Sequence, residues 1–216
     1  SLSLTTDGAT FSAPPLLFTR YEPARPATIA AVAPLASGLS QRAVLTVRGA
    51  NLAPTPRLAC SFVGEDGYSE ESAATMVAHN TLRCAAPPSG AARTVSLRIG
   101  LREDYFGSEW SEASVPFTFY DSNRPPEVTS ISRVYGPLDA AEAGEEDPLL
   151  VVGSNFAPGG LRVRFGGVAA VAATFVSLTQ LRVMVPHALA PQTVDVTASN
   201  NNDDDGDDDD EGEAAA

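Results

Sequence analysis

Few side chains in this sequence have the types and spacing that catalysis or metal binding requires. Of the two histidines, His79 falls in a predicted loop and His187 comes just after Pro186. Neither belongs to a spaced set with cysteine or carboxylate that could hold zinc. The sequence also has no Gly-x-Ser-x-Gly elbow, no phosphate-binding glycine loop followed by lysine and no dinucleotide-binding fingerprint. We therefore expect no catalytic residue, no metal and no cofactor.

A predicted hairpin between residues 101 and 110 concentrates aromatic and charged side chains. It contains the only tryptophan of the chain, and tryptophan, tyrosine and arginine are enriched at interface hot spots. The candidate binding residues are Arg102, Tyr105, Phe106 and Trp110. The carboxylates around the tip are interpreted as solvated rather than as a catalytic pair. The aromatic side chains could instead fold back on their own domain or pack against a neighbouring one.

The printed sequence ends in a run of acidic residues, from Asp203 to Glu213. An EF-hand calcium loop needs a bidentate glutamate at its twelfth position, and in the register that places Gly206 sixth this position is Gly212. Consecutive like charges without apolar residues are typical of solvated, disordered segments. We therefore interpret residues 201–216 as an acidic disordered tail without a calcium site.

The formal net charge of −13 comes mostly from this tail. Nine of the 27 acidic residues lie in it, so 18 acidic residues remain against 14 basic ones, a charge of −4 for the rest of the chain. Nucleic-acid binding needs a basic stripe that displaces counterions, and no apolar run approaches the roughly 18 to 20 residues that span a bilayer. We therefore expect no nucleic-acid partner and no membrane span in this segment.

The same order of short segments occurs twice, about 100 residues apart. Residues 47–54 read Val-Arg-Gly-Ala-Asn-Leu-Ala-Pro, and residues 151–158 read Val-Val-Gly-Ser-Asn-Phe-Ala-Pro. Likewise, Thr-Met-Val at residues 75–77 returns as Thr-Phe-Val at residues 174–176. The sequence therefore predicts two copies of one module.

Both copies have the pattern of short strands separated by turns. Apolar and polar residues alternate in residues 95–99, Val-Ser-Leu-Arg-Ile, and in residues 161–165, Leu-Arg-Val-Arg-Phe, which indicates strands with one buried face. Clusters of glycine, proline, asparagine and serine separate such segments, and no stretch keeps a helical period. The pattern predicts an all-β chain of antiparallel two-sheet sandwiches.

The repeated Gly-x-Asn-Leu/Phe motif predicts a turn at the end of a strand. We expect Gly49 and Gly153 to take a positive φ, which glycine adopts without a Cβ clash, and the asparagine to hydrogen-bond nearby backbone. Leu52 and Phe156 would then return to the core. The motif is interpreted as structural rather than as a ligand site.

Taken together, these segments resemble the IPT/TIG domains, immunoglobulin-like modules of plexin-type and hepatocyte-growth-factor-type receptors, fibrocystin-like surface proteins and some transcription factors. The resemblance covers nearly all of residues 1–200. In the first copy the matching segments are residues 29–34, 45–52, 60–62, 82–87 and 117–120. The second copy follows the same order from Val128 to Ala198. The resemblance implies tandem immunoglobulin-like antiparallel β-sandwiches.

The resemblance also implies a disulfide between Cys60 and Cys84, which match the paired cysteines of extracellular family members. They are the only cysteines of the chain, and the alternative is a pair of buried free thiols. Closing a loop of about 25 residues would add roughly 3 kcal/mol in the chain-entropy model. The second copy has Arg164 and Val183 at the positions assigned to these cysteines.

The register of the resemblance divides the chain into four parts. These are the last strands of a preceding module, a complete domain, a second domain that lacks its last strand, and the acidic tail, at residues 1–23, 24–121, 122–200 and 201–216. Phe-Thr-Arg-Tyr at residues 18–21 matches Phe-Thr-Phe-Tyr at residues 117–120. Residues 1–21 could therefore occupy the vacant edge of the second domain, in cis or from a neighbouring molecule. The alternative is a fragment of a longer array.

The function expected from these features is a non-catalytic extracellular or cell-surface interaction and adhesion module. Tandem domains would act as a semi-rigid spacer, because two prolines restrict the linker at residues 121–126, and as a protein-binding surface. The expected partners are proteins, neighbouring immunoglobulin-like modules or a second copy bound through the open edge. The alternative function is an accessory, carbohydrate-associated domain of a secreted polysaccharide-acting enzyme.

Overall fold

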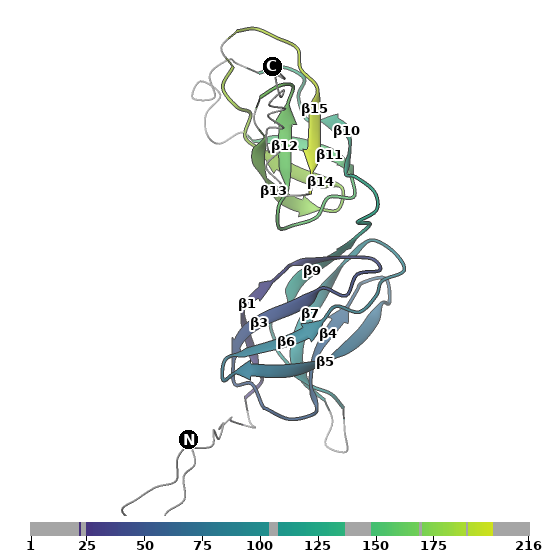
Figure 1. Cartoon of the computed structure of the whole chain (residues 1–216), viewed down its shortest axis with the longest axis vertical. Coiled ribbons are helices and arrows are strands. Elements are labelled where there is room, and N and C mark those ends of the chain that lie inside the picture. The colour runs from purple at the N-terminus through teal and green to yellow at the C-terminus, as the bar shows by residue number, and fades with distance from the viewer. Residues whose placement is uncertain are drawn as a thin grey trace, which may run out of the picture. The chain divides into compact units, whose positions relative to one another are not determined.

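The computed structural model of the chain describes residues 22, 25–103, 108–136, 148–168, 170–188 and 190–200. Every regular element among them is a β-strand, which confirms the all-β prediction. The chain divides into two compact units, Ser1–Tyr120 and Asp121–Ala216, and Figure 1 labels most of their strands. Within this described part, no helix is long and apolar enough to cross a membrane.

The described part of the first unit contains nine strands. They are β1 (Thr28–Ala33), β2 (Ala36–Gly38), β3 (Val44–Ala50), β4 (Leu58–Val63), β5 (Ser69–Ala78), β6 (Thr81–Ala85), β7 (Arg93–Leu101), β8 (Glu109–Trp110) and β9 (Val115–Tyr120). They lie in the order β1-β3-β6-β5-β4-β7-β9-β2, with β8 beside β7. The long β5 belongs to both layers, because residues 69–73 pair with β4 and residues 74–78 pair with β6.

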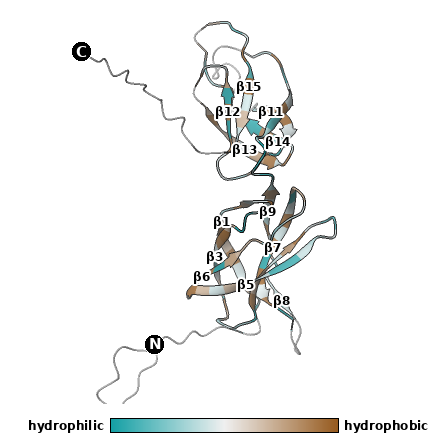
Figure 2. Cartoon of the chain, turned by 45° about the vertical axis from the view of Figure 1, so that its right-hand side comes forward, coloured by the Kyte–Doolittle hydropathy of each residue, from teal (hydrophilic) through white to brown (hydrophobic). Residues whose placement is uncertain are grey.

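Alternating side chains build the core of the first unit between its two layers. On β7, Val95, Leu97 and Ile99 are buried while Thr94, Ser96 and Arg98 are exposed. The strands of both units carry hydrophobic as well as hydrophilic residues (Figure 2). On β9, Phe117 and Phe119 are fully buried. The period-two pattern therefore predicts the buried face correctly.

The second unit repeats six of these strands in the same order. They are β10 (Glu127–Ile131), β11 (Leu149–Ser154), β12 (Arg162–Phe165), β13 (Val171–Ser177), β14 (Gln180–Val183) and β15 (Val196–Ser199). The order β10-β11-β14-β13-β12-β15 corresponds to β1-β3-β6-β5-β4-β7 of the first unit. Even the irregularity in the first strand is repeated, since the register shifts between Ile29 and Ala31 and again between Val128 and Ser130.

Within the described residues, the second unit has no counterpart of β2, β8 or β9. In the first unit, β9 pairs antiparallel with β7 and parallel with β2. In the second unit the order of described strands ends at β15. Residues 1–21 are not among those described, so the predicted pairing of that segment with this edge lies outside what the structure describes.

The disulfide between Cys60 and Cys84 is present and joins the two layers of the first unit. Cys60 lies on β4 and Cys84 on β6, and both side chains are buried, with Cα atoms 6.4 Å apart. This confirms the pairing implied by the family resemblance. The bond crosses the core, so it holds the two sheets together as well as closing a loop.

The prediction that Arg164 replaces Cys60 in the second unit is wrong. Ala59 pairs with Ala73 on β5, and Arg162 pairs with Ala172, the corresponding residue of β13. Ala59 and Arg162 are therefore equivalent positions. The residues that follow them, Cys60 and Val163, are equivalent too. Val163 and Val183 are both buried in the core of the second unit, so a pair of valines occupies the place of the disulfide.

The Gly-x-Asn motif works differently from the sequence-based expectation. Gly49 and Gly153 lie inside β3 and β11, and the residues with positive φ are Asn51, at 55°, and Asn155, at 60°. Asparagine is one of the few non-glycine residues that adopt this left-handed conformation readily. The prediction of a positive φ at the glycines was therefore wrong, while the burial of Leu52 and Phe156 is confirmed.

The glycine of the motif is required by close approach of the first strand. A Cβ at Gly153 would collide with the carbonyl oxygen of Glu127 on β10 and with the Phe156 ring, and one at Gly49 would meet the carbonyl oxygen of Thr28. Such a clash with backbone is not relieved by a side-chain rotation. The glycine therefore allows the first strand of each unit to cross its neighbour closely.

Replacing Gly153 with alanine should destabilise the second unit by about 1–3 kcal/mol, as overpacking does. Amide hydrogen exchange of β10 and β11 under mildly denaturing conditions measures this loss. Gly167→Ala is the matched control, because a Cβ there meets nothing within 4 Å. Equal exchange rates in the two variants would contradict the close-approach argument.

The asparagine of the motif clamps the segment that enters its own unit. The Asn155 amide oxygen accepts a hydrogen bond from Asp121 N at 2.9 Å, and its amide nitrogen donates to the carbonyls of Asp121 and Arg124 at 2.9 and 2.6 Å. Asn51 makes the same three bonds with Glu22 and Arg25, at 2.7, 2.9 and 2.5 Å. The predicted backbone bonds therefore exist, but they reach residues 26 to 34 positions away rather than the local turn.

Asn155→Gly should remove the clamp without disturbing the positive φ, because glycine adopts that conformation freely. We expect a loss of about 1–3 kcal/mol in the second unit, as for several partly buried hydrogen bonds, and faster hydrogen exchange at the Asp121 amide. Asn123→Gly is the control for added backbone freedom, since the Asn123 side chain is exposed. Unchanged exchange at Asp121 in Asn155→Gly would show that the clamp does not hold the segment.

Candidate functional site

The structure brings two of the four predicted binding residues, Arg102 and Trp110, onto neighbouring legs of one hairpin. Arg102 follows β7, and its Nε lies 3.3 Å from a carboxylate oxygen of Glu71. Its carbonyl accepts hydrogen bonds from the Arg57 guanidinium at 3.0 and 2.7 Å. The side chains of Arg102 and Trp110 are half-buried. Tyr105 and Phe106 lie outside the described residues, so the role of this surface in binding stays a prediction.

Trp110 is held against β7 by the local backbone. It pairs with Gly100, and a Cβ at Gly100 would collide with the carbonyl of Glu109 and the Cα of Trp110. Ser111 then donates its N–H to the carbonyl of Ile99 and accepts the Ile99 N–H on its hydroxyl. The base of the hairpin is therefore fixed by pairing and by a buried serine.

A Tyr–Arg–Asp cluster covers the core of the first unit at β9. The Arg93 guanidinium lies 4.6 Å from the centroid of the Tyr68 ring and 2.6 Å from a carboxylate oxygen of Asp66. Burial raises the pKa of Tyr68, with a further rise from Glu70 and an opposing effect of Arg93. The Tyr68 ring packs against Phe119, so this cluster has a structural explanation.

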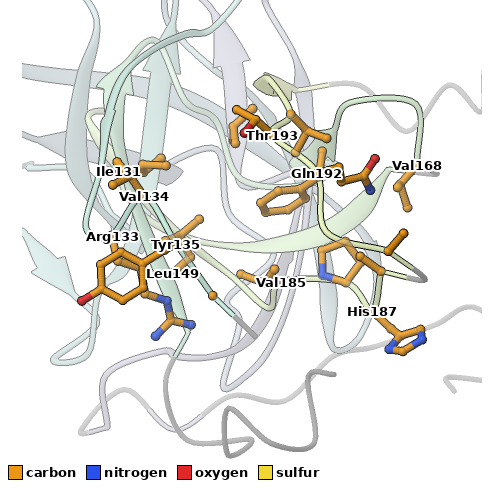
Figure 3. Close-up of a pocket in the computed structure, with 17 residues that line it drawn as sticks. Ile131, Arg133, Val134, Tyr135, Leu149, Val168, Val185, His187, Gln192 and Thr193 are labelled. Atoms are coloured by element: carbon orange, nitrogen blue, oxygen red, sulfur yellow. The ribbon is translucent and has the colours of Figure 1, made fainter. Parts of the chain in front are cut away.

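The second unit contains a cavity of about 200 Å³ that is lined by both apolar and polar residues. Figure 3 shows Ile131, Val134 and Leu149 on one side of it and Val168 and Gln192 on the other. Further apolar side chains complete the lining, among them Phe165, Val185, Val194 and Val196. The cavity is therefore walled by core-facing residues of the sandwich rather than by a surface loop alone.

Basic and aromatic side chains are also part of the described lining of the cavity. The described residues that line it include Arg133 and His187 and no carboxylate. Nearby, Val134 and Tyr135 are 85% and 82% exposed. A site of this composition favours an apolar or aromatic group from a neutral or acidic ligand. Among the residues that the structure describes, no three histidine, cysteine or carboxylate groups lie together in a way that could hold a metal ion.

This cavity was not predicted from the sequence. Its lining combines core residues such as Leu149 and Phe165 with residues of the connecting segments, and none of them stands out in the sequence by its chemistry.

A model of the IPT/TIG domain family matches residues 126–210. The second unit is an IPT/TIG domain. The first unit repeats the strand order of this IPT/TIG domain, its Gly-x-Asn motif and its asparagine clamp. No curated protein matches the chain by sequence.

Several solved structures are remotely similar to this chain. The extracellular region of plexin A4 is 13% identical with a TM-score of 0.39, and the match covers 82% of this chain and 17% of that one. A Bacteroides thetaiotaomicron protein of unknown function is 15% identical with a TM-score of 0.36, and the match covers 77% of this chain and 40% of that one. The surface glycan-binding protein PbSGBP-B from Prevotella bryantii is 15% identical with a TM-score of 0.28, and the match covers 82% of this chain and 39% of that one. The match therefore spans less than half of each of these chains, and such remote likeness does not indicate a function.

Proposed function

We propose that this chain is a non-catalytic extracellular or cell-surface interaction module, in which tandem immunoglobulin-like units serve as spacer and protein-binding surface. The observation that carries the proposal is the IPT/TIG match of the second unit, because domains of this family are generally non-catalytic interaction modules. The Cys60–Cys84 disulfide supports an extracellular setting, since disulfides persist in oxidising compartments.

The asparagine clamp supports the spacer role. Asn155 fixes the start of the segment that leads into the second unit through three hydrogen bonds. A clamped entry segment with two prolines, Pro125 and Pro126, has little backbone freedom. Two surfaces described above are candidates for binding partners, namely the hairpin with Arg102 and Trp110 and the cavity of the second unit.

The carbohydrate-associated alternative would need exposed aromatic rings on which sugars can stack. In the described part of the first unit, the interacting ring pairs involve Phe62, Tyr68, Phe117 and Phe119. These rings lie in or against the core. Among the described aromatic residues only Tyr135 is exposed. A single ring is a small platform for sugar stacking, so we do not propose this function.

The location is tested by staining cells that express the protein naturally with an antibody against the two units. We expect staining of intact cells at the level seen after permeabilisation. Alkylation of thiols in protein recovered from the same cells should label Cys60 and Cys84 only after reduction. Staining that requires permeabilisation, together with ready labelling of both thiols, would overturn the extracellular proposal.

A further inference from the structure

Both units carry the same three exposed side chains on the outer face of one sheet. They are Thr75, Val77 and Arg83 in the first unit and Thr174, Val176 and Arg182 in the second. Thr75 lies directly opposite Arg83, and Thr174 lies directly opposite Arg182, which places the Cβ atoms of each pair about 5 Å apart. We call each group of three a Thr–Val–Arg surface.

Core packing does not explain why these side chains are the same in both units. They point away from the core, since alternate residues of a strand face opposite sides. The other outward side chains larger than alanine on β3, on residues 74–78 of β5 and on β6 differ between the units. At equivalent register positions, Thr46, Arg48 and Thr81 are replaced by Leu150, Val152 and Gln180. The Thr–Val–Arg surface is thus the part of this face that the two units share.

A β-bulge places the valine of each surface. The strand register shifts at the same point in both units, between Met76 and Ala78 and between Phe175 and Ser177. Val77 and Val176 are therefore the extra residues of the two bulges, and they are 54% and 44% exposed. Bulges re-aim side chains and are over-represented next to functional sites. An apolar side chain held toward solvent by the same bulge in both units is typical of a contact surface.

The arginine of each surface lies among strands that contain no carboxylate. The strands β3 and β6 and residues 74–78 of β5 contain no aspartate or glutamate, and neither do β11, β13 and β14. This contrasts with a chain that has 27 acidic residues. No ion pair with a described residue neutralises Arg83 or Arg182. Their charge therefore favours an anionic partner.

We propose that each Thr–Val–Arg surface binds an acidic segment of a protein partner, in which an apolar residue lies two positions from a carboxylate. The guanidinium and the threonine hydroxyl donate hydrogen bonds to the carboxylate, and the apolar side chain covers the valine. Residues two apart in an extended segment point to the same side, as Thr75 and Val77 do on β5. The proposal rests on the protein-binding function proposed above and names the chemistry of the partner.

The acidic run of the chain itself fits these surfaces less well. Residues 203–211 read Asp-Asp-Asp-Gly-Asp-Asp-Asp-Asp-Glu and offer no large apolar side chain to cover Val77 or Val176. A net charge of −13 also opposes the association of two copies through their acidic segments. A partner segment that supplies both a carboxylate and an apolar side chain matches both parts of the surface.

The test is a titration of the 216-residue protein, labelled with nitrogen-15, with end-capped peptides at low salt. The peptide Ser-Glu-Ser-Leu-Ser should shift the backbone amide resonances of residues 75–83 and 174–182 saturably. We expect at least tenfold weaker binding of Ser-Gln-Ser-Leu-Ser, which lacks the carboxylate, and at least fivefold weaker binding of Ser-Glu-Ser-Ser-Ser, which lacks the apolar side chain. Equal binding of the three peptides, or shifts confined to other residues, would overturn the proposal.

Variants of the protein test each surface against the other. Arg83→Gln should weaken binding at residues 75–83 at least tenfold and leave binding at residues 174–182 unchanged, and Arg182→Gln should do the reverse. Arg98→Gln is the matched control, because Arg98 is exposed on β7 and its counterpart in the second unit is Thr197. This control should leave both sites unchanged.

Denaturant unfolding followed through Trp110 separates binding from stability. Because Arg83 and Arg98 are both exposed, Arg83→Gln and Arg98→Gln should have the same unfolding midpoint. A lower midpoint for Arg83→Gln together with unchanged peptide binding would mean that Arg83 has a structural role only, and the proposal would be wrong.

A sulfated polysaccharide and the acidic tail are the competing ligands. If a heparin oligosaccharide binds these surfaces more tightly than the peptide and still binds the variant with Val77→Asn and Val176→Asn, the surfaces recognise charge alone and the proposal is wrong. If removal of residues 201–216 shifts the same amide resonances without any peptide, the tail is the occupant and the proposal is also wrong. Failure of the peptides to bind a protein that stains intact cells would refute these surfaces and leave the extracellular function standing.

Discussion

Replacing Phe117 with alanine should destabilise the first unit by about 3–5 kcal/mol, the range for truncation of a buried phenylalanine. The Phe117 side chain is fully buried, and its ring meets those of Phe62 and Phe119 edge-on, with centroids 5.5 and 5.2 Å apart. The loss can be measured by denaturant unfolding followed through Trp110. This is the only tryptophan of the chain, so its fluorescence reports on the first unit alone.

Val44→Ala is the matched control for this experiment. Val44 lies on β3 of the same unit but is 59% exposed, so its truncation should change stability by no more than about 0.5 kcal/mol. A cost below about 1 kcal/mol for Phe117→Ala would mean that β9 contributes little to this core.

Much of the fold could be predicted because it depends on local patterns. Alternation along β7 gives the buried face directly, since side chains of a strand point to opposite sides. The repeat relates the two units segment by segment, and the family resemblance implies the Cys60–Cys84 pair. Each of these features depends on the type and spacing of residues, so it can be predicted from the sequence alone.

The errors concern how backbones approach one another. The repeat in the sequence shows that the Gly-x-Asn motif matters for the fold, but the sequence does not show which of its residues adopts a positive φ. In the structure, Gly153 is required by the nearby carbonyl of Glu127, which lies 26 positions earlier in the chain. Likewise, only the pairing of β12 with β13 reveals that Val163, rather than Arg164, corresponds to Cys60. Long-range register decides both cases.

The candidate site shows the same division. Comparing the two copies of the sequence predicts an open edge, which stays a prediction, whereas a cavity depends on which side chains face one another across the sandwich. Ile131 on β10 and Phe165 on β12 are far apart in the sequence, and both line the cavity. The hairpin with Trp110 stands out by composition, whereas the residues of the cavity have no distinctive composition in the sequence.

Removing the disulfide with Cys60→Ala and Cys84→Ala should destabilise the first unit by about 3 kcal/mol through the loss of the cross-link and by a further 1–2 kcal/mol through the cavity left by two buried sulfur atoms. The valine pair of the second unit suggests a matched variant. Cys60→Val with Cys84→Val also lacks the cross-link, but it fills the core as Val163 and Val183 do, so it should lose only the cross-link contribution.

Denaturant unfolding followed through Trp110 compares the unchanged protein, the protein with reductant and the two double variants. We expect reductant to lower the stability of the unchanged protein to about that of the valine variant and to leave both variants unaffected. Stability of the valine variant at or below that of the alanine variant would contradict the equivalence of the two core pairs. No effect of reductant on the unchanged protein would show that the disulfide does not stabilise the first unit, and both units would then depend on packing alone.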